Sequence, residues 1–274
     1  MSNYRALINT MSRGNNYSPR TQAFATASGI SDTSILNPLS VFDLGLISDG
    51  IIPAGISLVG SKIQVMLTLV GGTASTHKWN FMDPQDTDAA FRLVFSGGWT
   101  HSSTGALPNG TNGFAYIFYH PSTDCASQNS TSIGYYSRTD NTNTGYEIGG
   151  GGGTPRTSMA IRWAGTFYQS ANAAELGGYA NASSLGLHIV SRIDASNVVS
   201  YIRNTKTSVA QASSGRTADM VLLSALGQNA AGTALYFTDK ECAFAFIGTG
   251  LTDTDAGNLY TRIQTLQTSL GRQV

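Results

Sequence analysis

The sequence carries little charge. Lys and Arg number 16, Asp and Glu number 16, and charged residues make up 12% of the 274 residues. No stretch of five or more Lys or Arg occurs. A groove for nucleic acid needs a concentrated basic patch to neutralise phosphates. The composition therefore predicts that nucleic acid is not a partner.

The marks of secreted, metal-binding and membrane proteins are also missing. The two cysteines, Cys125 and Cys242, show no C-x-x-C spacing and no neighbouring Cys/His cluster, which favours free thiols over a disulfide or a metal role. The first residues, "MSNYRALINTMSRGNNYS", lack the apolar segment of a signal peptide. The longest apolar region, 51–70, is interrupted by Pro53, Lys62 and several glycines. It is too broken to span a membrane, so we expect no membrane insertion.

Groups suited to catalysis are scarce. The glutamates number three, Glu147, Glu175 and Glu241, and they are isolated in the sequence. Most glycoside hydrolases need two carboxyl groups on either side of the scissile bond. Neither G-x-S-x-G nor H-E-x-x-H occurs, and the run Gly149–Gly153 is not followed by the Lys-Ser/Thr of a P-loop. We therefore expect a protein that is not an enzyme, with a divergent glycan hydrolase as the least favoured alternative.

Short segments rich in β-branched and aromatic residues dominate the chain from about residue 56. About ten of them lie between residues 62 and 248, separated by turn-forming residues, as in "KIQVMLTLV" (62–70), "GFAYIFYH" (113–120) and "LGLHIVSRI" (185–193). Helices do not alternate with these strands, which disfavours a parallel α/β sheet. The pattern predicts an all-β fold, an antiparallel sandwich or jelly roll over residues 56–274.

Residues 1–55 have a different character. A polar arm, "SRGNNYSPR", is followed by Asn37 as a helix N-cap and Pro38 as the first helical residue. Leu39, Phe42 and Leu46 then recur at helical spacing. We interpret 1–55 as an N-terminal arm with a short helix, which serves attachment or oligomerisation.

The best helix signal lies at the C-terminus. Thr252 and Asp255 form a capping-box pattern, and Gly271 supplies a stop. Apolar residues recur between them on one face, at Leu259, Ile263, Leu266 and Leu270. This pattern predicts an amphipathic helix over 252–270 that packs on the sandwich rather than on a partner.

One stretch is the best candidate for ligand binding. "GGWTHSSTGALPNGTNGFAYIFYHPS", residues 97–122, places aromatic rings beside side-chain amides and hydroxyls. Glycan and peptide ligands are commonly held by such a combination. The alternative is that the Trp fills the core and the remainder is a solvated loop. The candidate residues are Trp99, His101, Asn109, Asn112 and Tyr116.

Two groups of residues are weaker candidates for metal binding. Asp83, Asp86 and Asp88 in "FMDPQDTDAAF" offer oxygen atoms that suit Ca²⁺. The favoured interpretation is a turn in which these aspartates cap backbone N–H groups. A second group would need His77, His101 and His120 to cluster in space, but single histidines in β proteins are mostly structural. We therefore expect no required cofactor.

Three phrases resemble a known family. They are "GGTASTHKWNFMDPQDTDAAFRLVFSGGWTHSSTGALPNGTNG" (71–113), "IGYYSRTDNT" (133–142) and "AFAFIGTGLTDTDAGNLYTRIQTLQTSLGRQV" (243–274). They are similar to a concanavalin A-like, laminin G-like jelly-roll module in virion structural proteins of tailed bacteriophages. In that module the last core strand runs into a "G-L-T/S-D" turn and a closing helix. The resemblance covers roughly residues 60–274 and supplies no catalytic residues.

The resemblance implies a virion structural protein. We expect a non-enzymatic fibre, spike or capsid-decoration module, made in the host bacterial cytoplasm and displayed on a head or tail. Its expected partners are other virion proteins through residues 1–55, further copies of itself in a homo-oligomer, and a host surface glycan through its loops. The alternative is a free-standing lectin whose Ca²⁺ is held by Asp83, Asp86 and Asp88.

Overall fold

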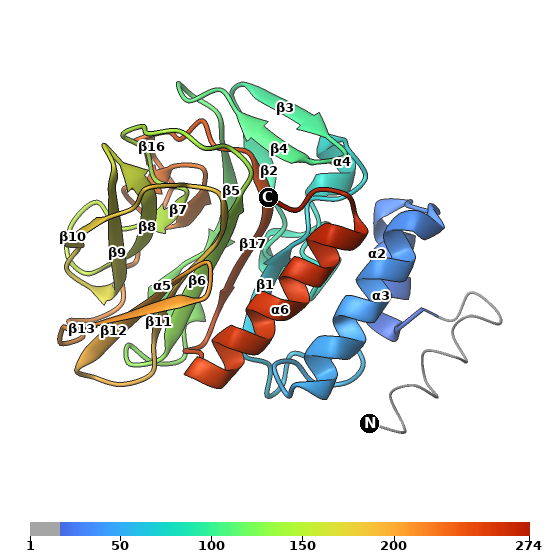
Figure 1. The fold of residues 1–274 in the computed structure, drawn as a ribbon, viewed down its shortest axis with the longest axis horizontal. Coiled ribbons are helices and arrows are strands. Elements are labelled where there is room, and N and C mark those ends of the chain that lie inside the picture. The colour runs from blue at the N-terminus through green and yellow to red at the C-terminus, as the bar shows by residue number, and fades with distance from the viewer. Residues whose placement is uncertain (1–16) are drawn as a thin grey trace.

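The computed structural model describes residues 17–274, and two antiparallel β-sheets packed face to face dominate it (Figure 1). Sheet A is eight-stranded, in the order β13-β12-β11-β6-β17-β4-β3, with β1 also paired to β17. Its strands are β1 (Ile63–Leu67), β3 (Trp99–Ser102), β4 (Gly105–Pro108), β6 (Thr131–Ser137), β11 (Gly186–Arg192), β12 (Asn197–Ile202), β13 (Thr205–Ala210) and β17 (Cys242–Gly248).

Sheet B is nine-stranded, in the order β10-β9-β8-β7-β14-β5-β2, with β15 and β16 attached beside β7. Its pairs are antiparallel except for a single parallel contact between β15 and β7. Its strands are β2 (Val94–Ser96), β5 (Phe114–Tyr119), β7 (Ile148–Gly150), β8 (Arg156–Trp163), β9 (Thr166–Ala173), β10 (Leu176–Ala180), β14 (Val221–Leu223), β15 (Leu226–Gly227) and β16 (Ala234–Leu235). The all-β jelly-roll sandwich expected from the sequence is confirmed.

The main core lies between the two sheets. Side chains of a strand point alternately to its two faces, and β5 shows this clearly. Ala115, Ile117 and Tyr119 are fully buried in the core with residues of β6, while the three residues that alternate with them along β5 face the other way and are only half-buried. Sheet B therefore has an outer face with side chains of its own.

Helices form a third layer on the outer face of sheet A (Figure 1). The helices of this layer are α2 (Pro19–Ser28), α3 (Thr33–Ser48) and α6 (Asp253–Ser269), and three short helices, α4 (Ala74–His77), η1 (Asp88–Ala90) and α5 (Pro121–Asp124), lie in connections between strands. Phe42 of α3 contacts Phe244 of β17 edge to face, with ring centroids 5.7 Å apart. Leu259, Ile263 and Leu266 of α6 are buried in the same apolar cluster.

The closing helix is confirmed, and its cap is the one expected. Thr252 is the N-cap of α6, its side chain accepts from the Asp255 backbone N–H, and the Asp255 carboxylate accepts from the Thr252 backbone N–H. This reciprocal arrangement is a capping box.

The N-terminal helix prediction was wrong in its start and incomplete. The helix begins at Thr33 with Asp32 as its N-cap, so Asn37 and Pro38 lie inside it. Apolar packing of α3 outweighs the hydrogen bond that an internal proline removes. The preceding helix α2 was not predicted, although Ser18, Pro19 and Gly29 mark its two ends.

The described part of the predicted arm 1–55 is built into the molecule. Arg20 of α2 and Asp43 of α3 form a fully buried ion pair, and Arg262 of α6 makes two hydrogen bonds to Asp49, of 2.7 and 2.9 Å. Helices α2 and α3 share one apolar cluster with sheet A and α6. The first part of the predicted arm, 1–16, lies outside the described residues. The expected attachment role of 1–55 stays a prediction.

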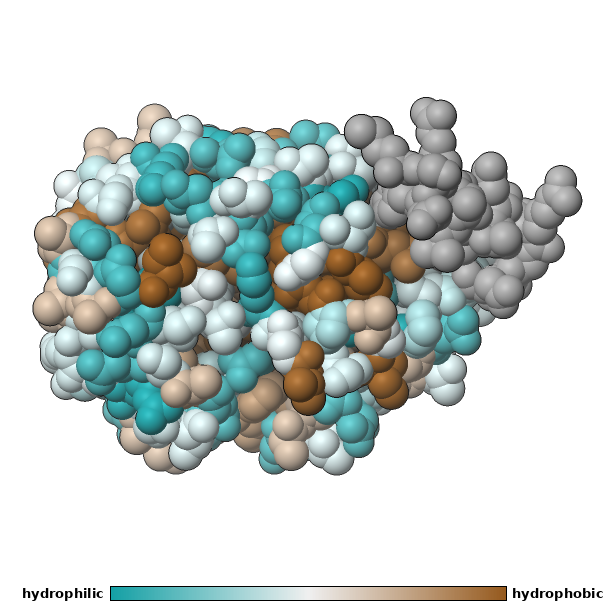
Figure 2. Space-filling view, turned by 90° about the horizontal axis from the view of Figure 1, so that it is seen from below, coloured by the Kyte–Doolittle hydropathy of each residue, from teal (hydrophilic) through white to brown (hydrophobic). Residues whose placement is uncertain are grey.

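Apolar side chains reach the surface only locally. On the face seen from below, apolar residues form a few patches among hydrophilic ones (Figure 2). The two most exposed large apolar side chains of the described residues, Val59 and Ile56, lie in the connection between α3 and β1. Across residues 17–274, no helix combines the length and apolarity needed to cross a membrane.

Candidate functional site

The outer face of sheet B carries two groups of aromatic side chains. One group surrounds Tyr146 and Leu226, and the other surrounds Met220 and Leu222. Both are distinct from the core between the sheets. Within residues 17–274, the long helices α2, α3 and α6 pack on sheet A and do not cover these aromatic rings.

A pocket of about 350 Å³ opens at the first group. We call it the outer-face pocket. Its residues come from β8, β9 and the connections beside β7, β10, β15 and β16, so the region 146–175 meets the region 228–236. Its lining consists of Tyr146, Gly152, Arg156, Trp163, Tyr168, Glu175, Gln228 and Tyr236.

Trp163 is the centre of the aromatic wall. Its ring meets Tyr146 at 5.5 Å and Tyr236 at 5.4 Å between centroids, both in edge-to-face geometry, and it meets Tyr168 at 6.3 Å. Such contacts stabilise the rings relative to one another. Tyr146 is almost buried, whereas Tyr236 is 47% exposed and available to a ligand.

The hairpin that joins β8 to β9 fixes the positions of Trp163 and Tyr168. Trp163 pairs with Thr166 across a two-residue turn. The turn residues, Ala164 and Gly165, have φ of 48° and 91°. Two positive φ values are typical of the type I′ turn, whose twist matches that of the strands it joins.

A charged group completes the pocket. The Arg156 guanidinium lies 3.1 Å from the Glu175 carboxylate and 3.3 Å from the Tyr146 hydroxyl, which itself hydrogen-bonds to Glu175. Burial and the neighbouring Glu175 carboxylate raise the pKa of Tyr146 well above its usual value. Tyr146 therefore stays protonated and donates to Glu175.

The glycine run allows close approach at the rim. A Cβ on Gly152 would lie 2.8 Å from the Gln228 carbonyl oxygen, too close for any side chain, and the Gly152 N–H donates to Asp219 at 2.7 Å. The segment 149–152 is therefore closely packed, whereas a Cβ on Gly153 would meet nothing within 4 Å. This segment brings Gln228 next to the β7–β8 connection.

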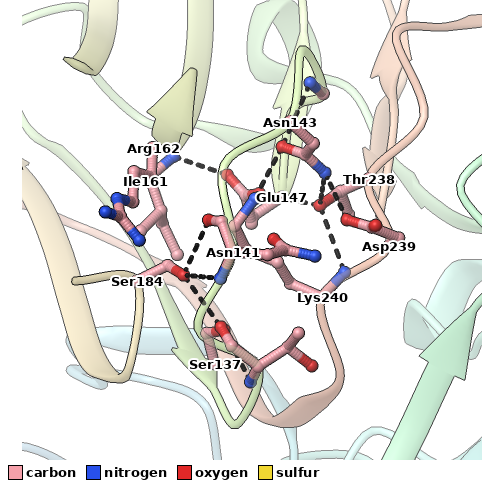
Figure 3. Close-up of polar contacts among 12 residues, drawn as sticks. Ser137, Asn141, Asn143, Glu147, Ile161, Arg162, Ser184, Thr238, Asp239 and Lys240 are labelled. Atoms are coloured by element: carbon pink, nitrogen blue, oxygen red, sulfur yellow. Dashed lines mark hydrogen bonds and ion pairs between the residues drawn. The ribbon is translucent and has the colours of Figure 1, made fainter. Parts of the chain in front are cut away.

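A buried polar network joins Glu147 to the segment that follows Tyr236 in the chain (Figure 3). Glu147 and Lys240 are both fully buried and lie 3.1 Å apart. Glu147 also accepts from the Thr238 hydroxyl at 2.8 Å, and the Lys240 ammonium donates to Asn143 Oδ1 at 2.6 Å. Both residue 238 and residue 240 belong to the segment that carries Tyr236, so the network anchors that segment. Tyr236 itself has a φ of 56°, which an isolated tyrosine rarely adopts.

The structure brings Trp99 and His101 together on β3. Their rings are stacked with centroids 6.0 Å apart, and both contact Phe95. The indole N–H of Trp99 donates to the backbone oxygens of Ser96 and Phe114. The indole N–H of Trp99 therefore links β3 to β2 and β5 within the protein.

Asn109 and Asn112 hold the loop that contains them. Asn109 Oδ1 accepts from the backbone N–H groups of Thr111, Asn112 and Gly113, and Asn112 Oδ1 accepts from Gly98. Their side-chain oxygens are occupied by backbone donors. Tyr116 lies elsewhere, on the outer face of sheet B in the group with Phe114 and Phe118.

The acidic group in 83–88 forms ion pairs. Asp86 contacts Lys78 at 2.6 Å and Arg92 at 2.8 Å, and Asp88 contacts Arg92 at 2.8 Å. Asp83 accepts from Gln85. Basic side chains therefore occupy the carboxylates of Asp86 and Asp88. Within residues 17–274, no three His, Cys, Asp or Glu side chains gather as metal ligands.

Two of the three histidines considered for a metal do meet. His77 Nδ1 lies 3.0 Å from His101 Nδ1, and His77 Nε2 accepts from the Gly72 N–H. The ring of His120 instead contacts the Ala218 carbonyl. Burial, with the nearby His101 and Arg272, lowers the pKa of His77 to about 3.

The glutamates do not converge on one site. Glu147 belongs to the buried network, Glu175 lies in the outer-face pocket, and Glu241 pairs with Arg138 at 2.9 Å. Glu175 is the single carboxyl group in the pocket lining.

Sequence reasoning missed most of the outer-face pocket. Of its lining, only Glu175 and the glycine run were singled out, and for other reasons. A signal did exist in "RWAGTFYQ", where a two-residue turn places Trp163 and Tyr168 on adjacent strands. Tyr236 has no comparable local signal, because only the return of the chain across sheet B brings it to Trp163.

No family model and no curated protein sequence matches this chain. Solved structures are similar to it in backbone. The Trypanosoma rangeli sialidase in complex with the inhibitor DANA has a TM-score of 0.49 and 10% identity, over 83% of this chain and 37% of that chain. Domain 4 of AbnA, a GH43 extracellular arabinanase from Geobacillus stearothermophilus in complex with arabinotriose, has a TM-score of 0.42 and 13% identity, over 73% of this chain and 98% of that chain.

The botulinum neurotoxin type G receptor binding domain is a further similar structure. Its TM-score is 0.37 and its identity 15%, over 74% of this chain and 52% of that chain. At these TM-scores and identities, the similarities transfer neither a ligand nor an activity to this chain.

Proposed function

We propose that this chain is a carbohydrate-binding β-sandwich module and that its ligand occupies the outer-face pocket. The observation that carries the proposal is an aromatic pocket with a paired Arg156 and Glu175 on the sheet face that the helical layer leaves open. Aromatic rings pack against the apolar faces of sugars, while a few polar groups orient their hydroxyls.

Substitution of the aromatic wall tests the proposal. Trp163→Ala and Tyr236→Ala should each weaken glycan binding by about tenfold or more, because each removes a large apolar contact. Tyr116→Ala is the matched control, since Tyr116 lies on the same sheet face in the other aromatic group. Binding is measured on a glycan array and then by calorimetry. Loss of binding in Tyr116→Ala alone would place the ligand near 97–122 instead.

We propose further that the module acts as a structural component of a tailed-phage virion, without enzymatic activity. The similarity of 71–113, 133–142 and 243–274 to such proteins supports the virion role. The single carboxyl group in the pocket supports binding without hydrolysis, because glycosidases commonly use two. Mass spectrometry of purified particles, and a polysaccharide hydrolysis assay, test the two parts. Absence of the protein from particles, or turnover that Glu175→Gln abolishes, would contradict them.

A further inference from the structure

The outer-face pocket carries no excess of positive charge, although it contains an arginine. The Arg156 guanidinium is paired with Glu175 at 3.1 Å. A second carboxylate, Asp219, lies at the rim and accepts from the Gly152 N–H at 2.7 Å. A ligand carboxylate entering here would meet two like charges and one cation that is already paired, and such juxtaposition opposes binding.

The donors of Arg156 are also largely in use. Its Nε donates to the Gly153 carbonyl at 3.2 Å, and one terminal nitrogen, Nη1, serves both Tyr146 and Glu175. Recognition of a carboxylate by arginine usually takes two parallel N–H donors from the same guanidinium. Nη2 is the guanidinium nitrogen left without a partner within residues 17–274. A single nitrogen suits a hydroxyl or a ring oxygen.

Neutral hydroxyl groups would find many partners in the same pocket. Several polar groups of the lining make no side-chain hydrogen bond to another residue of the described chain. Three of them belong to aromatic side chains, and together they include donors, acceptors and groups that are both. These groups are the Trp163 indole N–H, the Tyr168 and Tyr236 hydroxyls, the Gln228 amide and the second Glu175 oxygen.

The size of the pocket limits the ligand. At about 350 Å³ it is near the lower end of the range for small-molecule sites, roughly 300–1,000 Å³. A pocket of this size holds one or two sugar rings rather than a long stretch of polysaccharide.

We infer that the outer-face pocket selects a neutral pyranose, at the end of a glycan, over sugars that carry a carboxylate. This inference rests on the proposed carbohydrate-binding function and specifies its ligand class. Glu175 is the residue that sets the selectivity. It accepts hydrogen bonds from the hydroxyls of a neutral sugar, neutralises the charge of Arg156 and repels the carboxylate of an acidic ligand.

Titration of the intact protein with small sugars tests the inference. The probes are the methyl glycosides of glucose, galactose, mannose and N-acetylglucosamine, compared with those of glucuronic acid and N-acetylneuraminic acid. At least one neutral glycoside should bind about tenfold more tightly than either acid. Glu175→Gln should narrow this ratio, because it removes the repelling carboxylate. Asp83→Asn, which makes the same charge change outside the pocket, should leave the ratio unchanged.

The possible results separate this inference from the function on which it rests. If acidic sugars bind as tightly as neutral ones and Trp163→Ala loses all binding, the inferred selectivity is overturned while the proposed site is supported. No binding of any sugar, or binding that Trp163→Ala leaves intact, would overturn both. If Glu175→Gln does not fold, as judged by circular dichroism, the comparison of neutral and acidic sugars on the unchanged protein still decides.

Discussion

Buried charge has a structural use in this molecule. Glu147 and Lys240 are completely shielded from water, yet each finds its opposite charge and further hydrogen bonds with Thr238 and Asn143. A buried pair that is fully hydrogen-bonded adds little net stability, but it is costly to break. Its effect here is to tie the segment 236–240 to β7 and thereby to hold Tyr236 beside Trp163.

Breaking this pair should destabilise the protein strongly. Lys240→Met leaves the Glu147 carboxylate buried without a cation and should lower the free energy of unfolding by about 3–5 kcal/mol. Lys206→Met removes an exposed pair with Asp253 and should cost less than about 1 kcal/mol. Urea denaturation measures both. The double variant Glu147→Leu/Lys240→Met should be more stable than Lys240→Met, and the prediction fails if it is not.

Two buried histidines should make the protein sensitive to mild acid. Burial lowers the pKa of His77 and of His188 to about 3, against 6.5 for an unperturbed histidine. The unfolded chain therefore binds more protons than the folded one between these values. The contribution of the two neutral histidines to the free energy of unfolding is therefore fully present above pH 6.5, and it is lost as the pH drops toward 3. Each histidine contributes about 1.4 kcal/mol per pH unit in this window.

A substitution isolates one of the two contributions. His188 donates from Nδ1 to the Gly186 carbonyl and accepts at Nε2 from Asn181, so glutamine keeps a polar group without a titrating ring. His188→Gln should have a shallower fall in unfolding free energy between about pH 6 and pH 5, where carboxylates are still ionised. A slope equal to that of the unchanged protein would show that His188 is not the titrating group.

Single residues also show where sequence reasoning reached its limit. Trp99, His101, Asn109 and Asn112 were chosen because their residue types suit ligand binding. The Trp99 indole N–H and the side-chain oxygens of Asn109 and Asn112 instead satisfy backbone groups of the same loop and strands, and His101 contacts His77. The same residue types cap loops and bind sugars, and only the hydrogen-bond partners seen in the structure distinguish the two roles.

The helices show which elements are locally encoded. The ends and the apolar stripe of α6 all lie within one short stretch, so this helix was predicted with its cap. For α3 the stripe was recognised but the start was not, because Pro38 suggested a first helical residue while Asp32 holds the cap. Helix α2 buries one large apolar residue, Phe24, and gives almost no periodic signal.

Helix α3 shares an apolar core with sheet A and α6, so we expect it to unfold together with the sandwich. Leu46 is fully buried in the cluster formed with sheet A and α6, whereas Val41 of the same helix is 37% exposed. Leu46→Ala should therefore lower the free energy of unfolding by about 2–5 kcal/mol, and Val41→Ala by less than about 1 kcal/mol. Tryptophan fluorescence is a suitable signal, since Trp79, Trp99 and Trp163 all lie outside α3.

The same experiment tests the predicted division of the chain at residue 55. Since α3 and the sandwich share a core, Leu46→Ala should destabilise the whole unit. The unfolding transition followed by tryptophan fluorescence should then shift to milder denaturing conditions and remain a single cooperative step. A tryptophan transition that Leu46→Ala leaves unchanged would show instead that the segment before residue 56 unfolds as a separate arm.

At the scale of the whole molecule, the arrangement of layers defines the site. Within residues 17–274, three long helices cover sheet A and the two sheets cover each other, and these helices leave the outer face of sheet B, where we propose the site, uncovered. That the chain consists mainly of β-strands was predictable from its short β-branched and aromatic segments, but residues 17–274 contain seventeen strands where about ten were expected. Their order was not predictable, because pairs such as β6 with β11 and β17 join residues separated by 50 to more than 100 positions.

The outer-face pocket follows from that order rather than from any motif. Tyr146, Trp163 and Tyr236 stand on separate segments that meet only when β7, β8 and the β15–β16 region are adjacent. The glycan ligand expected from loop residues 97–122 is therefore proposed for a different part of the same sandwich.

The most direct test of the central claim is calorimetric titration of a glycan ligand, first identified on an array, into the intact protein and into Trp163→Ala and Tyr116→Ala. Circular dichroism establishes that all three are folded. The outer-face pocket predicts binding to the intact protein and to Tyr116→Ala, with affinity reduced about tenfold or more in Trp163→Ala. Equal binding by folded Trp163→Ala and the unchanged protein would contradict the assignment of the pocket.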